Sequence, residues 1–462
     1  MRPLEIIDPL LLTLYLFWPH PRPFAVRLLP SAALILTLVH LEIEGFRWQM
    51  LPLHLLSSLL VLSSLFKIGV AGDWPSATSF IALILVVLAT ALPVLLPVPR
   101  YRKPSGRYLV GTTLHDFVDR TRQEIYSANN EPRRIMAQVW YPAKVTRADA
   151  PAAWMPHAKI FTRAIARYIH FPYFFLDHLA LIKMPAYQDA AISDRAEKFP
   201  VIVFSHGWNG FNTQNTSQAI ELASHGYVVI SIQHTYGAVM TVFSDGTTAP
   251  GNSKTLPEDE NDVDYEPVAR KLVDQWVGDI GFILDQFEGS NKTPGDRYYE
   301  KLDFARIGVY GHSTGSGAAI QFCARDPRGK AVLGMDPFMR PVAADVIAGG
   351  ISQPSFFMFS QLWADVLDSR NNVLFRNLRA NSPRNQGVIR IAGTRHYDFS
   401  DVPLLSPIGA QLGLRGALNG RRATEIVTAY LVEFFEMTLN DRPSKLLQSS
   451  PPAFPEVRDL IA

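Results

Sequence analysis

The first hundred residues carry long apolar stretches that set them apart from the rest of the chain. These stretches lie near residues 4–19, 24–41, 50–66 and 75–98. The fourth has no charged residue between Asp73 and Arg100, a length that exceeds the roughly 20 residues that a helix needs to cross a bilayer. The first two are weaker, because Asp8 interrupts one and Arg27 lies inside the other. The pattern predicts a transmembrane helical region of three or four spans over residues 1–100.

Two other interpretations of this region fit the pattern less well. A signal peptide has one short apolar core and a small-residue cleavage site, and the helices of a soluble bundle show polar faces at helical period. The fourth stretch shows no such face. The basic residues Arg100, Arg102, Lys103 and Arg107 follow it directly, and positive segments stay preferentially in the cytoplasm. We therefore expect a multi-pass membrane protein whose C-terminal domain lies on the cytoplasmic side.

From about residue 105, short runs rich in Val and Ile alternate with amphipathic stretches. The predicted strands are 135–141, 199–204, 227–232, 304–310, 331–335, 356–359 and 388–391, and the predicted helices are 214–224, 267–287, 316–324 and 423–437. Strands that are apolar on both faces and separated by helices indicate a mostly parallel sheet covered on both sides. This pattern predicts an α/β catalytic domain over residues 105–445, followed by a tail over 446–462.

Two segments interrupt this alternation. Residues 145–195 are rich in aromatic side chains and form a predicted insertion or lid. Within them Lys159, Arg163 and Arg167 recur every fourth residue, which indicates a basic amphipathic helix. Such a helix either lies on an anionic membrane surface or packs on the sheet as an ordinary surface helix. Residues 237–265 are predicted to be an acidic, solvated loop, because their spacing matches no calcium site.

Composition narrows the function classes. The net charge of +2 over 462 residues lacks the basic excess of a nucleic-acid-binding protein, so no nucleic-acid partner is expected. Cys323 is the single cysteine, which excludes an intramolecular disulfide framework. We expect no metal and no cofactor.

A candidate nucleophile lies in Gly311-His312-Ser313-Thr314-Gly315, which fits the pattern G-x-S-x-G. The motif follows a predicted strand and precedes a predicted helix, and this is the setting in which the serine of a nucleophile elbow projects above a sheet. Gly311 and Gly315 allow strand and helix to approach closely. The amide N–H of Thr314 is then a predicted donor to a developing oxyanion.

A serine hydroxyl needs a general base, and the α/β-hydrolase order along the chain is serine, acid, histidine. His396 is the only histidine after Ser313, so it is the predicted base. Asp336 directly follows the strand 331–335 and is the predicted acid, with Asp365 as the runner-up. This order predicts an α/β-hydrolase fold.

A second oxyanion donor is expected in a loop after an earlier strand. The segment Ser205–Gly210 follows the strand 199–204 and contains Gly207 and Gly210, which let the backbone approach a substrate. We assign the amide N–H of Trp208 as this donor.

The blocks FSHGWNGF (204–211), LASHGY (222–227) and LGMDPF (333–338), together with the G-x-S-x-G motif and His396, resemble the plasma or lipoprotein-associated type of platelet-activating factor acetylhydrolase. The resemblance runs from about residue 105 to 440. It implies calcium-independent hydrolysis of short or oxidised acyl esters of glycerophospholipids, as by a 1-alkyl-2-acetylglycerophosphocholine esterase. It also implies the triad Ser313, Asp336 and His396 and the donors Trp208 and Thr314. The N-terminal multi-span region departs from the family's usual pattern.

The predicted function is that of a membrane-anchored serine hydrolase that cleaves carboxylic esters through an acyl-enzyme. Its expected partners are a lipid or small ester substrate and a membrane. A lipase or thioesterase with another substrate remains open, because one triad serves several acyl groups. A non-catalytic membrane scaffold on a hydrolase fold is the second alternative.

Overall fold

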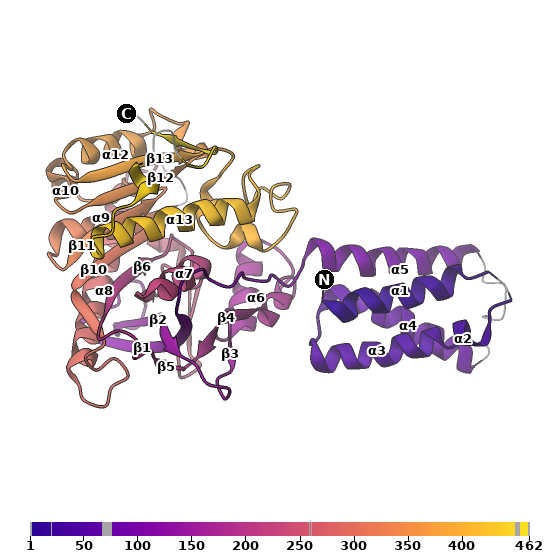
Figure 1. Ribbon diagram of the computed structural model, residues 1–462. Coiled ribbons are helices and arrows are strands. Elements are labelled where there is room, and N and C mark those ends of the chain that lie inside the picture. The colour runs from indigo at the N-terminus through magenta and orange to yellow at the C-terminus, as the bar shows by residue number, and fades with distance from the viewer. Residues whose placement is uncertain are drawn as a thin grey trace.

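The structure is a computed structural model that describes residues 2–19, 21–66, 76–257, 259, 261–448 and 453–460. It shows a helical bundle that extends to one side of an α/β domain (Figure 1). The charge-free run after Asp73 begins outside the described residues. Glu258 and Glu260 of the acidic segment also lie outside them.

The bundle is formed by the N-terminal apolar stretches. Its helices are α1 (Pro3–Phe17), α2 (Phe24–Arg27), α3 (Leu29–Ile43), the 3-10 helix η1 (Trp48–Met50), α4 (Leu51–Leu65) and α5 (Ser76–Leu95). Leu12, Ala33, Leu53, Leu60 and Ala89 are fully buried between them. Of the helices in the described ranges, one, Trp48–Leu65, is long and apolar enough to cross a membrane, while Leu29–Ile43 and Phe80–Leu95 are apolar but shorter. The three or four membrane spans therefore remain a prediction.

The bundle contacts the α/β domain at η1 and at the end of α5. The indole N–H of Trp48 donates to the carbonyl oxygen of Phe175 at 3.0 Å, and the Trp48 ring packs against Phe174. The hydroxyl of Ser406 donates to the carbonyl oxygen of Leu95, at the end of α5, at 2.7 Å. The aromatic insertion and the segment after His396 therefore both meet the bundle.

A large mixed sheet forms the centre of the α/β domain. Its strands are β1 (Leu109–Gln123), β2 (Pro132–Lys144), β3 (Pro151–Ala153), β4 (Lys183–Gln188), β5 (Ala191–Ile192), β6 (Phe199–Ser205), β7 (Val228–Gln233), β10 (Leu302–His312), β11 (Gly329–Met335), β12 (Ser355–Ser360), β13 (Asn385–Ile391) and β14 (Val457–Asp459). They follow the order β14-β13-β12-β11-β10-β6-β7-β2-β1-β4-β3, with β5 beside β2. The run from β13 to β7 is parallel. The pairs β14–β13, β7–β2 and β2–β1 are antiparallel, and β1 pairs parallel with β4.

Helices cover both faces of this sheet (Figure 1). The longer helices are α6 (Ala158–Tyr168), α7 (Thr216–His225), α8 (Tyr265–Lys292), α9 (Thr314–Arg325), α12 (Arg370–Ala380) and α13 (Gly420–Leu439), and the short ones are α10 (Ala344–Gly349), α11 (Gln361–Ala364), α14 (Lys445–Gln448), η2 (Asp177–Leu181), η3 (Ser253–Thr255), η4 (His396–Phe399) and η5 (Val402–Leu404). The core on one face includes residues of α8, α9, α10 and α12. The core on the other includes residues of α6, α7 and α13. The prediction of an α/β domain with a mostly parallel sheet is confirmed.

Two segments differ from the expectation. Residues 237–265 are not wholly a solvated loop, because β8 (Met240–Val242) and β9 (Thr248–Pro250) form a hairpin within them, and Asp245 pairs with Arg134 of β2 at 2.9 Å. The strand β1 was not expected. Its first half is mostly buried, its second half is rich in polar and charged residues, and it pairs antiparallel with β2 over most of its length.

Candidate active site

Ser313 occupies the sharp turn between β10 and α9. Its backbone has φ 57° and ψ −122°, a left-handed conformation that is strained for a residue with a side chain. A Cβ at Gly315 would lie 2.1 Å from the carbonyl oxygen of Ser205, and one at Gly311 would lie 2.3 Å from the carbonyl carbon of Gly315. Both glycines therefore have the close-approach role expected of a nucleophile elbow.

The backbone of Ser313 is fixed beside the carboxyl end of β11. Its amide N–H donates to the carbonyl oxygen of Met335 at 2.9 Å, and its carbonyl oxygen accepts from the N–H of Phe338 at 3.1 Å. Asp336 lies between these two residues along the chain. The serine and the predicted acid are therefore held on adjacent turns.

Asp336 and His396 form a hydrogen-bonded pair. The distance from Nδ1 of His396 to Oδ2 of Asp336 is 3.0 Å. Asp336 is fully buried, and it also accepts from the amide N–H and the hydroxyl of Ser360, both at 2.7 Å. These bonds fix the position of the carboxylate beside the imidazole. The charged acceptor holds the proton of His396 on Nδ1, which leaves Nε2 free to accept one.

Two aromatic rings hold the imidazole of His396. Trp363 stacks on it at 4.6 Å between ring centroids, and His312 packs against it at 4.4 Å. Nε2 of His312 donates to the carbonyl oxygen of His396 at 2.9 Å, and Nδ1 of His312 accepts from the side-chain amide of Gln214 at 3.2 Å. Burial lowers the pKa of His312 well below its usual range, so this ring is a neutral support for its neighbour.

The loop that carries His396 is tied to the start of α7. Side-chain amides of Asn215 and Gln218 donate to the carbonyl oxygen of Phe399, at 2.7 and 2.8 Å. The carboxylate of Asp398 accepts from the amide N–H of Arg395 at 2.7 Å and from that of Gly416 at 2.6 Å. The position of the predicted base is therefore determined by several elements and not by one flexible loop.

The loop after β6 reaches Ser313. A Cβ at Gly207 would lie 3.2 Å from the Cβ of Ser313, which places the peptide that leads to Trp208 beside the serine. Among the described residues, neither the amide N–H of Trp208 nor that of Thr314 has a hydrogen-bond acceptor. Unused N–H groups beside a serine are what an oxyanion hole requires. The indole of Trp208 donates to the hydroxyl of Thr255 at 2.8 Å and so lies in the wall.

The structure brings five of the predicted residues to one place: Ser313, Asp336, His396, Trp208 and Thr314. Within the described part of the chain, no hydrogen bond joins the hydroxyl of Ser313 to His396, and catalytic hydrogen bonds of this kind often form only with substrate bound.

The runner-up acid Asp365 lies elsewhere. It is half-exposed and pairs with Arg390 at 2.6 Å. Sequence reasoning did not identify Ser360 and Trp363 as supports. Ser360 ends β12, so the rule that functional groups follow the carboxyl ends of parallel strands could have found it.

One group of side chains has the spacing of metal ligands. Ligand atoms of Glu5, His40 and Glu44 in the bundle lie within 4.8 Å of one another. Arg47 pairs with Glu5 at 3.0 Å, and Arg2 pairs with Glu5 at 2.8 Å and with Glu44 at 3.6 Å. Two arginines therefore already balance the two carboxylates, and the group is an ion-pair network that joins α1 to the end of α3.

Comparison with known proteins agrees with this geometry. The family model for platelet-activating factor acetylhydrolase, isoform II, matches residues 98–272 and 294–445. Platelet-activating factor acetylhydrolase of Cavia porcellus is 26% identical over 368 residues, which cover 73% of this chain and 77% of the relative. A probable 1-alkyl-2-acetylglycerophosphocholine esterase of Arthroderma benhamiae is 24% identical over 405 residues, which cover 82% of this chain and 98% of the relative.

A solved structure shares the fold. The ferulic acid esterase from Streptomyces cinnamoneus superposes with a TM-score of 0.65 at 25% identity, over 78% of this chain and 99% of that one. The residues that the family model matches include the serine turn, the Asp336–His396 pair and the loop of Trp208. The family model matches well over half of the chain, and the chain therefore belongs to the platelet-activating factor acetylhydrolase, isoform II, family of ester hydrolases.

Proposed function

We propose that this protein is a membrane-anchored serine hydrolase that removes a short acyl group from a phospholipid-like ester. The observation that carries the proposal is the bond of 3.0 Å between Asp336 and His396 beside the strained turn of Ser313. The names of the relatives, platelet-activating factor acetylhydrolase and 1-alkyl-2-acetylglycerophosphocholine esterase, support an acetylated glycerophospholipid as the substrate class.

The proposed reaction has two acyl-transfer steps. His396 accepts the hydroxyl proton of Ser313 on Nε2 while the serine oxygen attacks the ester carbonyl carbon, and Asp336 stabilises the resulting imidazolium. Collapse of the tetrahedral intermediate breaks the bond to the alcohol, which takes the proton from His396. Water then attacks the acyl-enzyme with His396 as the base, which releases the acid and restores Ser313.

The oxyanion of each tetrahedral intermediate would accept from the amide N–H groups of Trp208 and Thr314. Thr314 is the first residue of α9, so its N–H has no partner inside the helix, and the helix dipole adds to the attraction for negative charge. Removal of one such donor in other hydrolases lowers kcat by about 10²–10³-fold, which indicates how much of the rate this pair supplies.

Membrane anchoring is supported by the outer surface of the bundle. Large apolar side chains are exposed on each of its long helices, among them Leu10 (61%), Leu38 (60%), Leu59 (56%) and Phe80 (63%). Exposed apolar surface of this extent is costly in water and favourable against lipid tails. Arg100, Arg102 and Lys103 follow the bundle, and the hydrolase domain is proposed to lie on the cytoplasmic side.

A thioester or a longer acyl ester is the second candidate substrate, since the same three groups act on any of these acyl carbons. A non-catalytic scaffold is disfavoured, because such a protein has no need for an unused pair of amide N–H groups beside a strained serine. A panel of acetylated phospholipids, longer-chain phospholipids and acyl thioesters separates the substrates.

The test uses the full chain in detergent or lipid. The parent should hydrolyse p-nitrophenyl acetate and react with a fluorophosphonate. Ser313→Ala should lose both, with a rate reduced by several orders of magnitude. The control is Ser352→Ala, an exposed serine that precedes β12 and so lies at the end of the sheet opposite to Ser360 and Asp336. Equal activity in parent and Ser313→Ala would reject the serine mechanism, and release of the protein from membranes by alkaline carbonate would reject the anchor.

A further inference from the structure

A second series of serine, histidine and aspartate lies buried behind the loop of Trp208. The hydroxyl of Ser205, the last residue of β6, is 2.9 Å from Nε2 of His234, and Nδ1 of His234 is 2.9 Å from Oδ2 of Asp279 in α8. All three side chains are fully buried. Because no substrate can reach this hydroxyl, the series needs a function other than nucleophilic attack.

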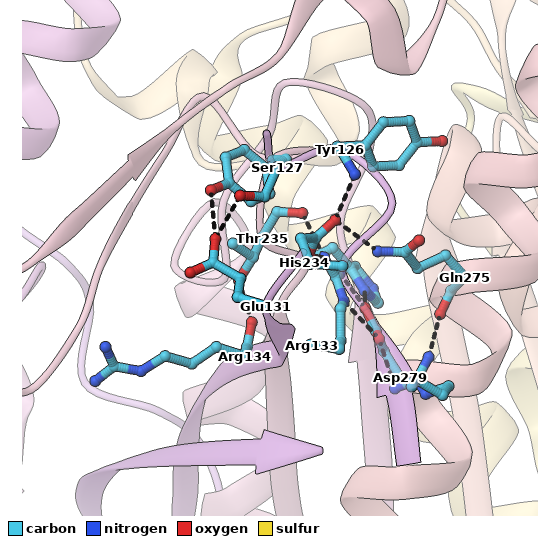
Figure 2. A network of polar contacts seen from close by, with 12 residues as sticks. Tyr126, Ser127, Glu131, Arg133, Arg134, His234, Thr235, Gln275 and Asp279 are labelled. Atoms are coloured by element: carbon cyan, nitrogen blue, oxygen red, sulfur yellow. Dashed lines mark hydrogen bonds and ion pairs between the residues drawn. The ribbon is translucent and has the colours of Figure 1, made fainter. Parts of the chain in front are cut away.

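The charges around the series determine which atoms carry protons. Arg133 donates to both oxygens of Asp279, at 3.1 and 2.6 Å, and Arg122 donates to Oδ1 at 2.9 Å. Figure 2 shows Arg133, His234 and Asp279 converging in this network. Burial lowers the pKa of His234, so the ring is neutral. Its Nδ1–H donates to the carboxylate of Asp279, and Ser205 donates its hydroxyl proton to Nε2.

The network reaches Trp208 from one side through His206. The amide N–H of His234 donates to Nε2 of His206 at 3.2 Å, and Nδ1–H of His206 donates to the carbonyl oxygen of Gly207 at 2.7 Å. That carbonyl belongs to the peptide whose N–H is the proposed oxyanion donor of Trp208. The ring of His206 therefore fixes the orientation of this peptide plane, and it is itself held by the backbone N–H of His234 and by edge-to-face packing against the ring of His234 at 5.1 Å between centroids.

The network also reaches Trp208 from the other side. The carbonyl oxygen of His234 accepts from the N–H of Gly237 at 3.1 Å, and the carbonyl oxygen of Gly237 accepts from the N–H of Asn209 at 2.8 Å. Asn209 has a φ of 54°, so the chain turns sharply just after Trp208. The ring of His234 is itself fixed by stacking on Trp276 at 4.2 Å.

We propose that His234 is a positioning residue that orients the amide N–H of Trp208 toward the oxyanion, and that Ser205 and Asp279 hold its ring in the required place and tautomer. This rests on the proposed function, since it assigns a role within the same reaction. Among the described residues, no hydrogen bond or ring contact joins His234 to Ser313, so the effect of His234 passes through the peptide between Gly207 and Trp208. If the amide N–H of Trp208 no longer points at the oxyanion, binding of the transition state should weaken more than binding of the ester substrate.

The mildest perturbation is Ser205→Ala, which leaves Nε2 of His234 without its donor. The matched control is Ser231→Ala, because Ser231 lies at equal depth on β7, opposite Phe204 of β6. Its hydroxyl has no partner among the described residues. The two changes remove the same atom from neighbouring strands, and only one of them touches the network.

The measurements are kcat and KM for p-nitrophenyl acetate and the inhibition constant of a trifluoromethyl ketone, which forms a tetrahedral anionic adduct with the serine. Active sites are counted by end-point fluorophosphonate titration, so that unfolded protein does not enter kcat. We expect Ser205→Ala to lower kcat about 10-fold, a fraction of the 10²–10³-fold loss of a whole donor. KM should stay within about two-fold and the inhibition constant should rise in proportion, while Ser231→Ala should match the parent.

A third variant tests whether the effect of Ser205→Ala comes from a general loss of structure. Ser205→Cys keeps the shape of the side chain with a weaker donor, and its kcat should fall between those of the parent and Ser205→Ala. If both Ser205 variants lower the unfolding midpoint but keep the parent's kcat per active site and inhibition constant, the network is only structural and the proposal is overturned. A parent without ester hydrolysis would instead contradict the proposed function.

Discussion

Replacement of Asp336 by asparagine tests the triad through the tautomer of His396. The oxygen Oδ1 of Asp336 accepts from a backbone N–H, that of Ser360, at 2.7 Å, and this donor cannot reverse. The carbonyl oxygen of an asparagine must therefore take the place of Oδ1. Its NH₂ group then takes the place of Oδ2, which faces Nδ1 of His396 at 3.0 Å.

An NH₂ group at this position requires Nδ1 of His396 to be the acceptor. The ring proton then moves to Nε2, the atom that must accept the proton of Ser313. A base in the wrong tautomer lowers kcat by about 10⁴-fold, which equals about 5.4 kcal/mol of transition-state stabilisation at 1.36 kcal/mol per factor of ten. The hydroxyl of Ser360 can rotate to accept from the new NH₂ group, so the fold should persist.

The assay is hydrolysis of p-nitrophenyl acetate by the full chain near neutral pH, with kcat and KM determined separately. Asp336→Asn should lose about 10⁴-fold in kcat with little change in KM. The control Asp365→Asn, at the runner-up position on the surface, should lose nothing measurable. A loss of less than ten-fold in Asp336→Asn, or a large loss in Asp365→Asn, would refute the assignment of the acid.

Three further outcomes follow from the structure. Gly315→Ala places a methyl group 2.1 Å from the carbonyl oxygen of Ser205 and should lower kcat about 100-fold, whereas Gly349→Ala, with open space around it, should match the parent in the same ester assay. Burial raises the pKa of Asp401 to about 7, so its contribution to stability is complete at pH values below its ordinary pKa and is lost as the pH rises toward 7. Denaturant unfolding should therefore show the free-energy difference between parent and Asp401→Asn falling from about pH 4 to pH 7, and a constant difference would contradict this. Burial also raises the pKa of the thiol of Cys323, so N-ethylmaleimide should label this residue only after denaturation, and rapid labelling of the native protein would contradict its burial.

The strands at the centre of the sheet were predictable because their burial leaves a direct mark on the sequence. All seven residues of β6 and all six of β7 are buried, and both strands are mainly apolar. β1 was missed because the second half of the strand carries charged and polar side chains. The strand is defined by its pairing with β2, and a local sequence pattern does not reveal pairing with another strand. The β8–β9 hairpin was missed for a similar reason, since Asp245 is neutralised by Arg134 from a distant strand.

The principal residues of the site were predictable from chain order, and their supports were not. The order of serine, acid and histidine left one candidate base, His396, and the strand end before Asp336 indicated the acid. The roles of Ser360, Trp363 and Gln214 depend on the register between strands and on how two loops cross above the sheet. The N-terminal bundle shows the same limit, because hydropathy along the chain does not reveal which side chains of α1, α3, α4 and α5 point outward.

A serine, a histidine and an aspartate come together twice in this fold. Ser205, His234 and Asp279 are hydrogen-bonded throughout, whereas in the Ser313 set the described bond is the one between His396 and Asp336, and physical environment separates the two sets. Asp279 is bound by Arg133 and Arg122, so much of its charge is already neutralised, and the same arginines oppose protonation of His234. Asp336 accepts from neutral donors of Ser360, so its charge remains available to an imidazolium.

The exposure of the histidine and the backbone strain of the serine also distinguish the two sets. The side chain of His396 is 22% exposed, whereas that of His234 is fully buried. Ser313 has a strained backbone beside two N–H groups that have no acceptor among the residues that the structure describes, whereas Ser205 ends a regular strand. A serine, a histidine and an aspartate become a catalytic group only when the acid keeps its charge, the base meets solvent and the oxyanion has donors. In the Ser205 set, the hydrogen bonds are proposed to hold the loop of Trp208 in place.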